Sequence, residues 1–238
     1  MPRHDRLDAL RGAAIVWMAV FHLCFDLNHF GWMQPRQDFY ADPFWTLQRS
    51  AIVSLFLFCA GVSQAVALAA GQGWGRFWRR WAQVAGCALL VGAGSALMFP
   101  HSWISFGVLH AIALMLVLGR LVAPLPGPAL VVLGAALLVL PHVWTHPYFD
   151  SRWMNWVGLV TRKPVTEDYV PLLPWWGVML WGQAAGRWLL ARRAHVLSGR
   201  LPRVARPLAV LGRWSLSFYM LHQPVLIGLL MLAATIGR

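Results

Sequence analysis

Charged residues are scarce in this chain, and acidic ones are scarcest. Only 12% of the 238 residues are charged, with 8 acidic against 20 basic residues, whereas soluble domains carry about 25% charge. Hydrophobic residues make up 59% of the chain, and the mean hydropathy is +0.57. This composition argues against a soluble domain and predicts an all-α, polytopic membrane bundle.

Cysteine is also scarce, and the three that occur form no CxxC pair. The chain lacks HExxH and comparable ligand spacings, so no metal site is expected. It also lacks a glycine-rich phosphate loop and a nucleophile elbow. Its arginines lie between apolar runs, which favours a topology signal over nucleic-acid binding. Disulfide scaffolds, metalloenzymes and nucleic-acid-binding proteins are therefore disfavoured.

Seven apolar runs approach the ~20 residues that a membrane helix needs. The chain is predicted to be one membrane domain, residues 1–238, with no internal repeat. If the N-terminus is cytoplasmic, 14 of the 20 basic residues lie on the inner side, as the positive-inside rule requires. The predicted spans are Leu7–His29, Thr46–Ala70, Phe77–Phe99, Trp103–Val122, Pro128–Thr145, Leu172–Ala191 and Leu208–Ile236.

The first predicted span carries four ionisable residues on one face, namely Arg11, His22, Asp26 and His29. At about 100° per residue, their spacing stacks them in a single stripe. Ionisable groups inside a span cost about 2.5–3.5 kcal/mol each and usually face a polar cavity. We therefore expect the chemistry to take place along this stripe.

Two outer loops are long enough to form a lid or an acceptor site, Phe30–Trp45 and Pro147–Pro171. The second combines charges with aromatic residues, and Trp153 and Asp168 are its candidate substrate contacts. A plain solvated connector is an equally good interpretation. His110 and His222, in the fourth and seventh predicted spans, are further candidates for lining the cavity.

Several motifs resemble bacterial members of the heparan-alpha-glucosaminide N-acetyltransferase catalytic-domain family. They span nearly the whole chain in order: RLDALRG (Arg6–Gly12), FHLCFDLN (Phe21–Asn28), ISFGVLH (Ile104–His110), DYVPLLPW (Asp168–Trp175) and LGRWSLSFYMLHQP (Leu211–Pro224). A wider similarity is to family 3 acyltransferases, which carry an arginine, ten residues and a histidine in the first helix. Arg11 and His22 match that spacing.

The resemblance implies acetyl transfer from cytoplasmic acetyl-CoA to a glycan or amino-sugar acceptor outside a bacterial inner membrane. It also implies that Arg76, Arg79 and Arg80, with Arg11, bind the cofactor, since an Arg-x-x-Arg motif follows the second helix. Guanidinium groups bind phosphates bidentately. Without the resemblance, however, the same arginines would be interpreted as topology anchors at the cytoplasmic end of a helix. No metal is implied.

Acetyl transfer to an amine or hydroxyl requires a base, and histidine is suited to that role near neutral pH. We expect His22 to be the base and Asp26 to orient it, as in hydrolase triads. His29 is the alternative, because the lysosomal relative's histidine lies in the first outer loop. A small proton-coupled transporter or permease is the competing function. The acceptor, the choice between O- and N-acetylation, and the oligomeric state (monomer or homodimer) stay open.

Overall fold

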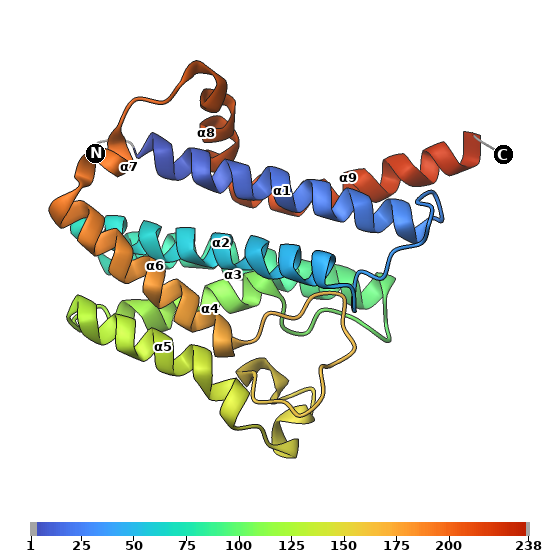
Figure 1. The fold of residues 1–238 in the computed structure, drawn as a ribbon, viewed down its shortest axis with the longest axis horizontal. Coiled ribbons are helices and arrows are strands. Elements are labelled where there is room, and N and C mark those ends of the chain that lie inside the picture. Colours follow the sequence, from blue (N-terminus) through green and yellow to red (C-terminus); the bar gives the residue numbers. More distant parts are fainter. Residues whose placement is uncertain (1–3, 237–238) are drawn as a thin grey trace. The chain divides into compact units, whose positions relative to one another are not determined.

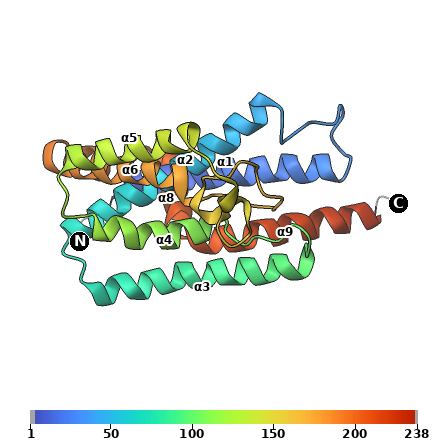
Figure 2. The ribbon, with the colours of Figure 1, turned by 90° about the horizontal axis from the view of Figure 1, so that it is seen from below.

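The computed structural model describes residues 4–236, and these form helices and no strand (Figures 1 and 2). The all-α prediction is confirmed. The contacts divide the chain into two compact units, one of residues 57–194 and the other of residues up to 56 together with those from 195 onward. The single-domain expectation stays a prediction, and each unit is described by itself.

The unit formed by both ends of the chain is built on α1 (Asp5–His29). It also contains the first half of α2 (Pro43–Ala69), with α8 (Arg206–Arg213) and α9 (Ser215–Ile236), and α1 packs against both α8 and α9 (Figure 1). Glycines permit the close approach of α1 and α8. A Cβ on Gly12 would lie 1.9 Å from the backbone oxygen of Leu208, and one on Gly212 would lie 1.8 Å from that of Asp8.

An aromatic core fixes the first outer loop to this unit. Phe21 packs edge-on against Phe39 and Trp45, and the last two rings stack with centroids 4.0 Å apart. All three are buried together with Met18 and Ile52. Burying a large apolar side chain stabilises a fold by about 1.5–3 kcal/mol, so this loop is an ordered part of the structure.

The end of α1 is set by a glycine. Gly31 has φ of +78°, a left-handed conformation that glycine adopts at low cost. The backbone N–H of Trp32 then donates to Leu27 O at 2.9 Å, which closes a Schellman-type cap. His29 is therefore the last helical residue, and its side chain is exposed.

The middle unit contains the rest of the long helices, and α5 and α6 run side by side within it (Figure 2). Gly134 and Gly177 let these two backbones meet, since a Cβ on Gly177 would lie 2.5 Å from Gly134 O. The elements are α3 (Trp74–Met98), α4 (Val108–Leu121), α5 (Gly127–Val143), the 3-10 turns η1 (Pro147–Asp150) and η2 (Asn155–Val157), and α6 (Leu172–Arg192). A short α7 (Ala194–Ser198) and η3 (Arg203–Ala205) follow in the sequence and, from residue 195 onward, belong to the unit formed by both ends of the chain.

A buried arginine ties α4 to the turn between α2 and α3. Arg120 is 9% exposed and donates to Gln72 O at 2.6 Å. Its guanidinium also lies over the rings of Trp74 and Phe77, 4.4 and 4.8 Å from their centroids. Cation–π contacts of this kind are stabilising when desolvated, which explains how a charge is held in an apolar unit.

Helices occupy all seven predicted positions, with two corrections. The fourth begins at Val108 instead of Trp103, because the chain turns at residues 99–107 before Gly107 precedes the helix. The seventh is not continuous, since it is divided at Trp214 into α8 and α9. By length and hydropathy, the described residues contain four helices able to cross a membrane, namely α1, α2, α3 and α9, with α4 and α5 as shorter apolar helices.

The packing of α1 on α8 can be tested by adding one methyl group. We expect Gly12→Ala to lower the thermal unfolding midpoint in detergent, because overpacking against a backbone costs about 1–3 kcal/mol. Gly86→Ala is the matched control, since a Cβ on this α3 glycine meets nothing within 4 Å. The control is expected to be neutral or slightly stabilising. Equal midpoints for the two variants would contradict the close approach.

Candidate functional site

Two histidines from α1 and α9 form a direct hydrogen bond. His22 Nδ1 lies 2.8 Å from His222 Nε2, and the two rings stack with centroids 5.0 Å apart. His222 is 8% exposed and also stacks on Phe218. The structure thus brings together two predicted site residues that are 200 positions apart in the chain.

The backbone determines which ring nitrogens carry protons. His222 Nδ1 lies 2.7 Å from Tyr219 O, a carbonyl that can only accept, so Nδ1 carries the hydrogen. In neutral His222, Nε2 is therefore an acceptor, and His22 Nδ1 must donate to it. This assignment leaves the lone pair of His22 on Nε2, as general base catalysis requires.

Asp26 is held by a neighbouring residue of α9. It is 5% exposed, and Gln223 Nε2 donates to its two carboxylate oxygens at 3.0 and 3.1 Å. The Gln223 side chain also interacts with His22. Its Oε1 is buried and forms no hydrogen bond with residues 4–236. Asp26 is therefore connected to the histidine pair through Gln223.

A pocket of about 600 Å³ opens where α1 meets the first outer loop. Two of its lining residues are joined by paired hydrogen bonds, in which the side chain of Asn28 donates to Gln37 O at 2.9 Å and accepts from Gln37 N at 2.8 Å. The lining residues are Phe25, Asn28, His29, Arg36, Gln37, Asp38, Phe39 and Tyr40. His29 is thus at a solvent-open pocket, while His22 lies further down the helix.

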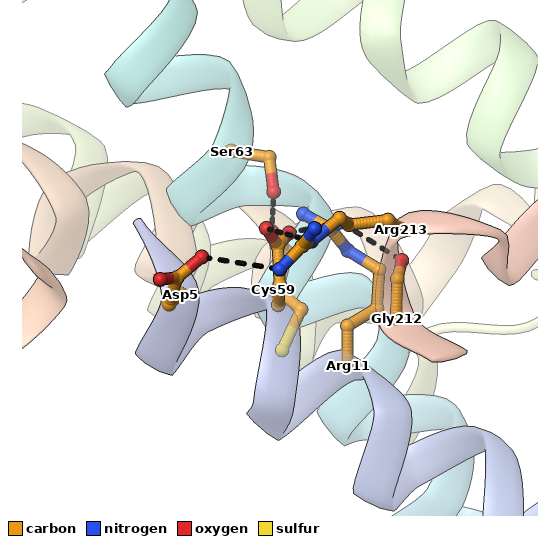
Figure 3. A network of polar contacts seen from close by, with 7 residues as sticks. Asp5, Arg11, Cys59, Ser63, Gly212 and Arg213 are labelled. Carbon is orange, nitrogen blue, oxygen red and sulfur yellow. Dashed lines mark hydrogen bonds and ion pairs between the residues drawn. The ribbon is translucent and has the colours of Figure 1, made fainter. Parts of the chain in front are cut away.

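Arg11 is engaged at the other end of α1. It donates to Asp8 Oδ1 at 3.0 Å and to Gly212 O at 3.3 Å. Arg213 of α8 lies 3.5 Å from Asp5 in the same group of contacts (Figure 3). In this structure Arg11 therefore joins α1 to α8, and its predicted cofactor contact stays a prediction.

The three arginines predicted to bind phosphate lie in the first two turns of α3 and are all exposed. Arg76 donates to Gly71 O at 3.0 Å, and Arg80 donates to Gln83 Oε1 at 3.0 Å. No side chain caps this helix at Gly73, so its first N–H groups remain open to an anion. The residues present fit the phosphate end of a nucleotide cofactor.

Asp168 and His110 hold the start of α4. Asp168 Oδ2 accepts from Val108 N at 2.7 Å, and His110 Nδ1 accepts from Gly107 N at 3.3 Å. These bonds satisfy N–H groups that a helix leaves unpaired at its first turn. The geometry gives both residues a structural role, and their predicted substrate contacts are untested.

The second outer loop is also well fixed. Asp150 accepts from the hydroxyl of Thr161 at 2.5 Å, and this bond keeps the pKa of Asp150 below its usual range. Tyr169 donates to Asn155 O at 2.7 Å, and burial raises the pKa of Tyr169. Trp153 points outward and is 86% exposed.

Residues 3–224 match the heparan-alpha-glucosaminide N-acetyltransferase catalytic family. The chain belongs to this family. The comparisons with curated proteins and with solved structures gave no match. Membership supports a membrane acetyltransferase in general, with acetyl-CoA as the general co-substrate of the family.

Sequence reasoning missed the residues that complete the site. Gln223 stands beside His222 in the sequence, but its bond to Asp26 depends on how α9 packs on α1. Arg36 and Asp38 line the pocket from the first outer loop, for which the sequence indicated only a sufficient length for a lid or an acceptor site. A usable signal was the Asp38–Tyr40 segment, because Asp in a turn often accepts from the backbone N–H two residues later.

Two substitutions can distinguish a helix-capping role of Asp168 from a substrate-binding role. We expect Asp168→Ala to lower stability by about 0.5–2 kcal/mol, the usual cost of losing a helix cap. Asp168→Asn should recover most of this, because its amide oxygen can still accept from Val108 N. The measurement is the thermal unfolding midpoint of each variant. A stable alanine variant with a raised KM for the acceptor would instead indicate substrate binding.

Proposed function

We propose that this protein transfers an acetyl group from cytoplasmic acetyl-CoA to an amine or hydroxyl of a glycan on the far side of a bacterial inner membrane. The family match supports the general reaction class. The observation that carries the assignment to this site is the His22–His222 hydrogen bond, because it presents a basic nitrogen on a membrane helix. Nothing in the described residues favours the permease alternative.

His22 is the proposed general base. Its Nε2 takes the proton of the acceptor as the nucleophile attacks the thioester carbonyl, and later gives it to the leaving thiolate. His222 keeps the ring in the required tautomer, as the buried carboxylate does in a hydrolase triad. His222 thus takes the orienting role that the sequence suggested for Asp26.

The Asp26–Gln223 pair supports the protonated state of this base. Once Nε2 of His22 carries a proton, the unpartnered Oε1 of Gln223 is an acceptor in the same neighbourhood. The Asp26 carboxylate binds the amide end of that side chain. Polarisation along such a chain strengthens each hydrogen bond, so the network stabilises a transient positive charge.

The donor is proposed to be held by Arg76, Arg79 and Arg80. Their exposed guanidinium groups and the open N–H groups of α3 would bind the CoA phosphates. Acetyl-CoA supplies the activated thioester when bound. The protein's own contribution is to hold the phosphates, to position the acceptor and to move one proton through His22.

The base can be tested by measuring turnover and donor binding separately. We expect His22→Ala to reduce release of CoA thiol with glucosamine as acceptor by at least a hundredfold, since general base catalysis contributes about 10²–10⁴-fold. Acetyl-CoA affinity, measured by calorimetry, should stay unchanged. His142→Ala is the matched control, because His142 is an exposed histidine of α5. His29→Ala should cost less than His22→Ala.

Two variants of His222 check the orienting role. His222→Gln keeps an acceptor for His22 Nδ1 and should retain more turnover than His222→Leu, with KM for acetyl-CoA unaffected in both. An active His22→Ala together with an inactive His29→Ala would overturn the assignment and move the reaction to the outer pocket.

Cofactor capture is tested on α3. We expect the double variant Arg76→Gln/Arg79→Gln to bind acetyl-CoA at least tenfold more weakly, because two guanidinium contacts to phosphate are lost. The control is Arg192→Gln/Arg193→Gln, a pair of exposed arginines at the end of α6. Unchanged affinity in the first variant would leave these arginines as topology signals alone.

A further inference from the structure

We infer that α8 and the turn before it form a docking surface for the headgroups of anionic phospholipids. The inference is independent of the proposed acetyl transfer, because it concerns a surface that the reaction does not use. Its charge comes from four exposed arginines, here called the basic surface: Arg6, Arg200, Arg203 and Arg206. All four belong to the unit formed by both ends of the chain.

The helix α8 is too short to cross a membrane. Its 8 residues extend about 12 Å, whereas the hydrocarbon core of a bilayer is about 30 Å thick. It packs along the N-terminal half of α1, where Gly12 and Gly212 permit close contact (Figure 1). Since α1 is itself long and apolar enough to cross a membrane, α8 lies beside one end of a candidate span, where lipid headgroups are found.

The residues of α8 divide into three faces. Ala209 and Gly212 are buried on the face that packs on α1. Arg206 and Arg213 are seven positions apart, so at about 100° per residue they lie within about 20° of each other on a second, basic face. The third face is apolar, and its Val210 is 50% exposed. A helix with a basic face and an exposed apolar face is typical of one that lies in the membrane interface.

Exposed apolar side chains also flank α8 on both sides. Val204, in η3 just before the helix, is 86% exposed, and Trp214, directly after it, is 66% exposed. Tryptophan is enriched where membrane and water meet. A soluble anion would pair with the arginines and leave these apolar groups in water. A phospholipid supplies both partners, because its phosphate pairs with guanidinium groups and its acyl chains cover the apolar side chains.

The charges of the basic surface are not neutralised within the fold. Among residues 4–236, no side-chain hydrogen bond or ion pair is made by Arg200, Arg203 or Arg206. Arg6 brings a fourth guanidinium to the same place, because its Nη2 donates to the backbone oxygen of Arg200 at 3.3 Å. Four like charges gathered in this way repel one another, and an anionic surface relieves that repulsion.

The carboxylates of this region have other arginine partners. Asp5 Oδ1 lies 3.5 Å from Arg213, and Asp8 Oδ1 lies 3.0 Å from Arg11. The sequence contains no further acidic residue after Asp168, so the segment around α8 contributes none of its own. Segments of this kind, rich in arginine and adjacent to a membrane helix, are attracted to anionic lipids. The basic surface therefore fits a lipid surface of negative charge.

The test compares an anionic with a zwitterionic lipid. The full-length protein in an uncharged detergent is titrated with dioleoyl phosphatidylglycerol or dioleoyl phosphatidylcholine, and native mass spectrometry measures the bound lipid. We expect phosphatidylglycerol to bind at least tenfold more tightly, since each arginine near an anionic surface contributes about fivefold. The triple variant Arg200→Gln/Arg203→Gln/Arg206→Gln should lose this preference. Phosphatidylglycerol should also raise the thermal unfolding midpoint of the wild type and not that of the variant.

The matched control removes the same charge from three exposed residues of the second outer loop, in the variant Arg152→Gln/Arg162→Gln/Lys163→Gln. It should keep the preference for phosphatidylglycerol. Equal binding of the two lipids by the wild type, an unaltered preference in the α8 variant, or an equal loss in the control overturns the inference. Glycerol 3-phosphate has the phosphate without acyl chains and should not displace the lipid. If it competes as well as phosphatidylglycerol does, the surface binds a soluble anion and the lipid assignment is wrong.

Discussion

The hydrogen bond between His22 and His222 is the interaction on which the site depends. A polar side chain inside an apolar helix is costly to bury unless it is hydrogen-bonded. Here the carbonyl of Tyr219 accepts from Nδ1 of His222, and Nε2 of His222 accepts from Nδ1 of His22. The same bond orients the proposed base and joins α9 to α1. The packing of α9 on α1 and the proposed proton transfer therefore both require the hydrogen bond between these two residues.

Satisfied polar groups elsewhere show what distinguishes a site from a structural contact. Arg120 donates a hydrogen bond to the Gln72 carbonyl, and its guanidinium makes cation–π contacts with two aromatic rings. Arg187 is bonded to the carbonyls of Leu125 and Ala123, where α4 is joined to α5. These contacts hold both guanidinium groups within the fold. In contrast, His22 Nε2 keeps its lone pair, and Arg36 forms no ion pair with the described part of the chain. Both residues belong to α1 and the loop that follows it.

Periodicity and composition predicted the helices because apolar length is a local property. The break at Trp214 was missed because an apolar run does not reveal where a helix must turn to pack on α1. The same contrast between local patterns and long-range contacts holds for the candidate site residues. The stripe on α1 was readable from spacing alone, and His222 was suspected from its position. The Asp26–Gln223 bond and the caps on α4 are long-range contacts, which spacing within one helix cannot specify.

The ionisable residues of α1 lie at fixed intervals along the axis of that helix. Arg11 and His22 are separated by eleven residues and His22 and His29 by seven, which correspond to about 16 Å and about 10 Å along the axis. Helix geometry fixes these intervals because a continuous α1 carries all three residues. A base at the position of His29 would act in an open pocket, where water competes for the thioester. His22 lies deeper along α1, where its ring is partly buried and hydrogen-bonded to His222, which is why we propose it, and not His29, as the base.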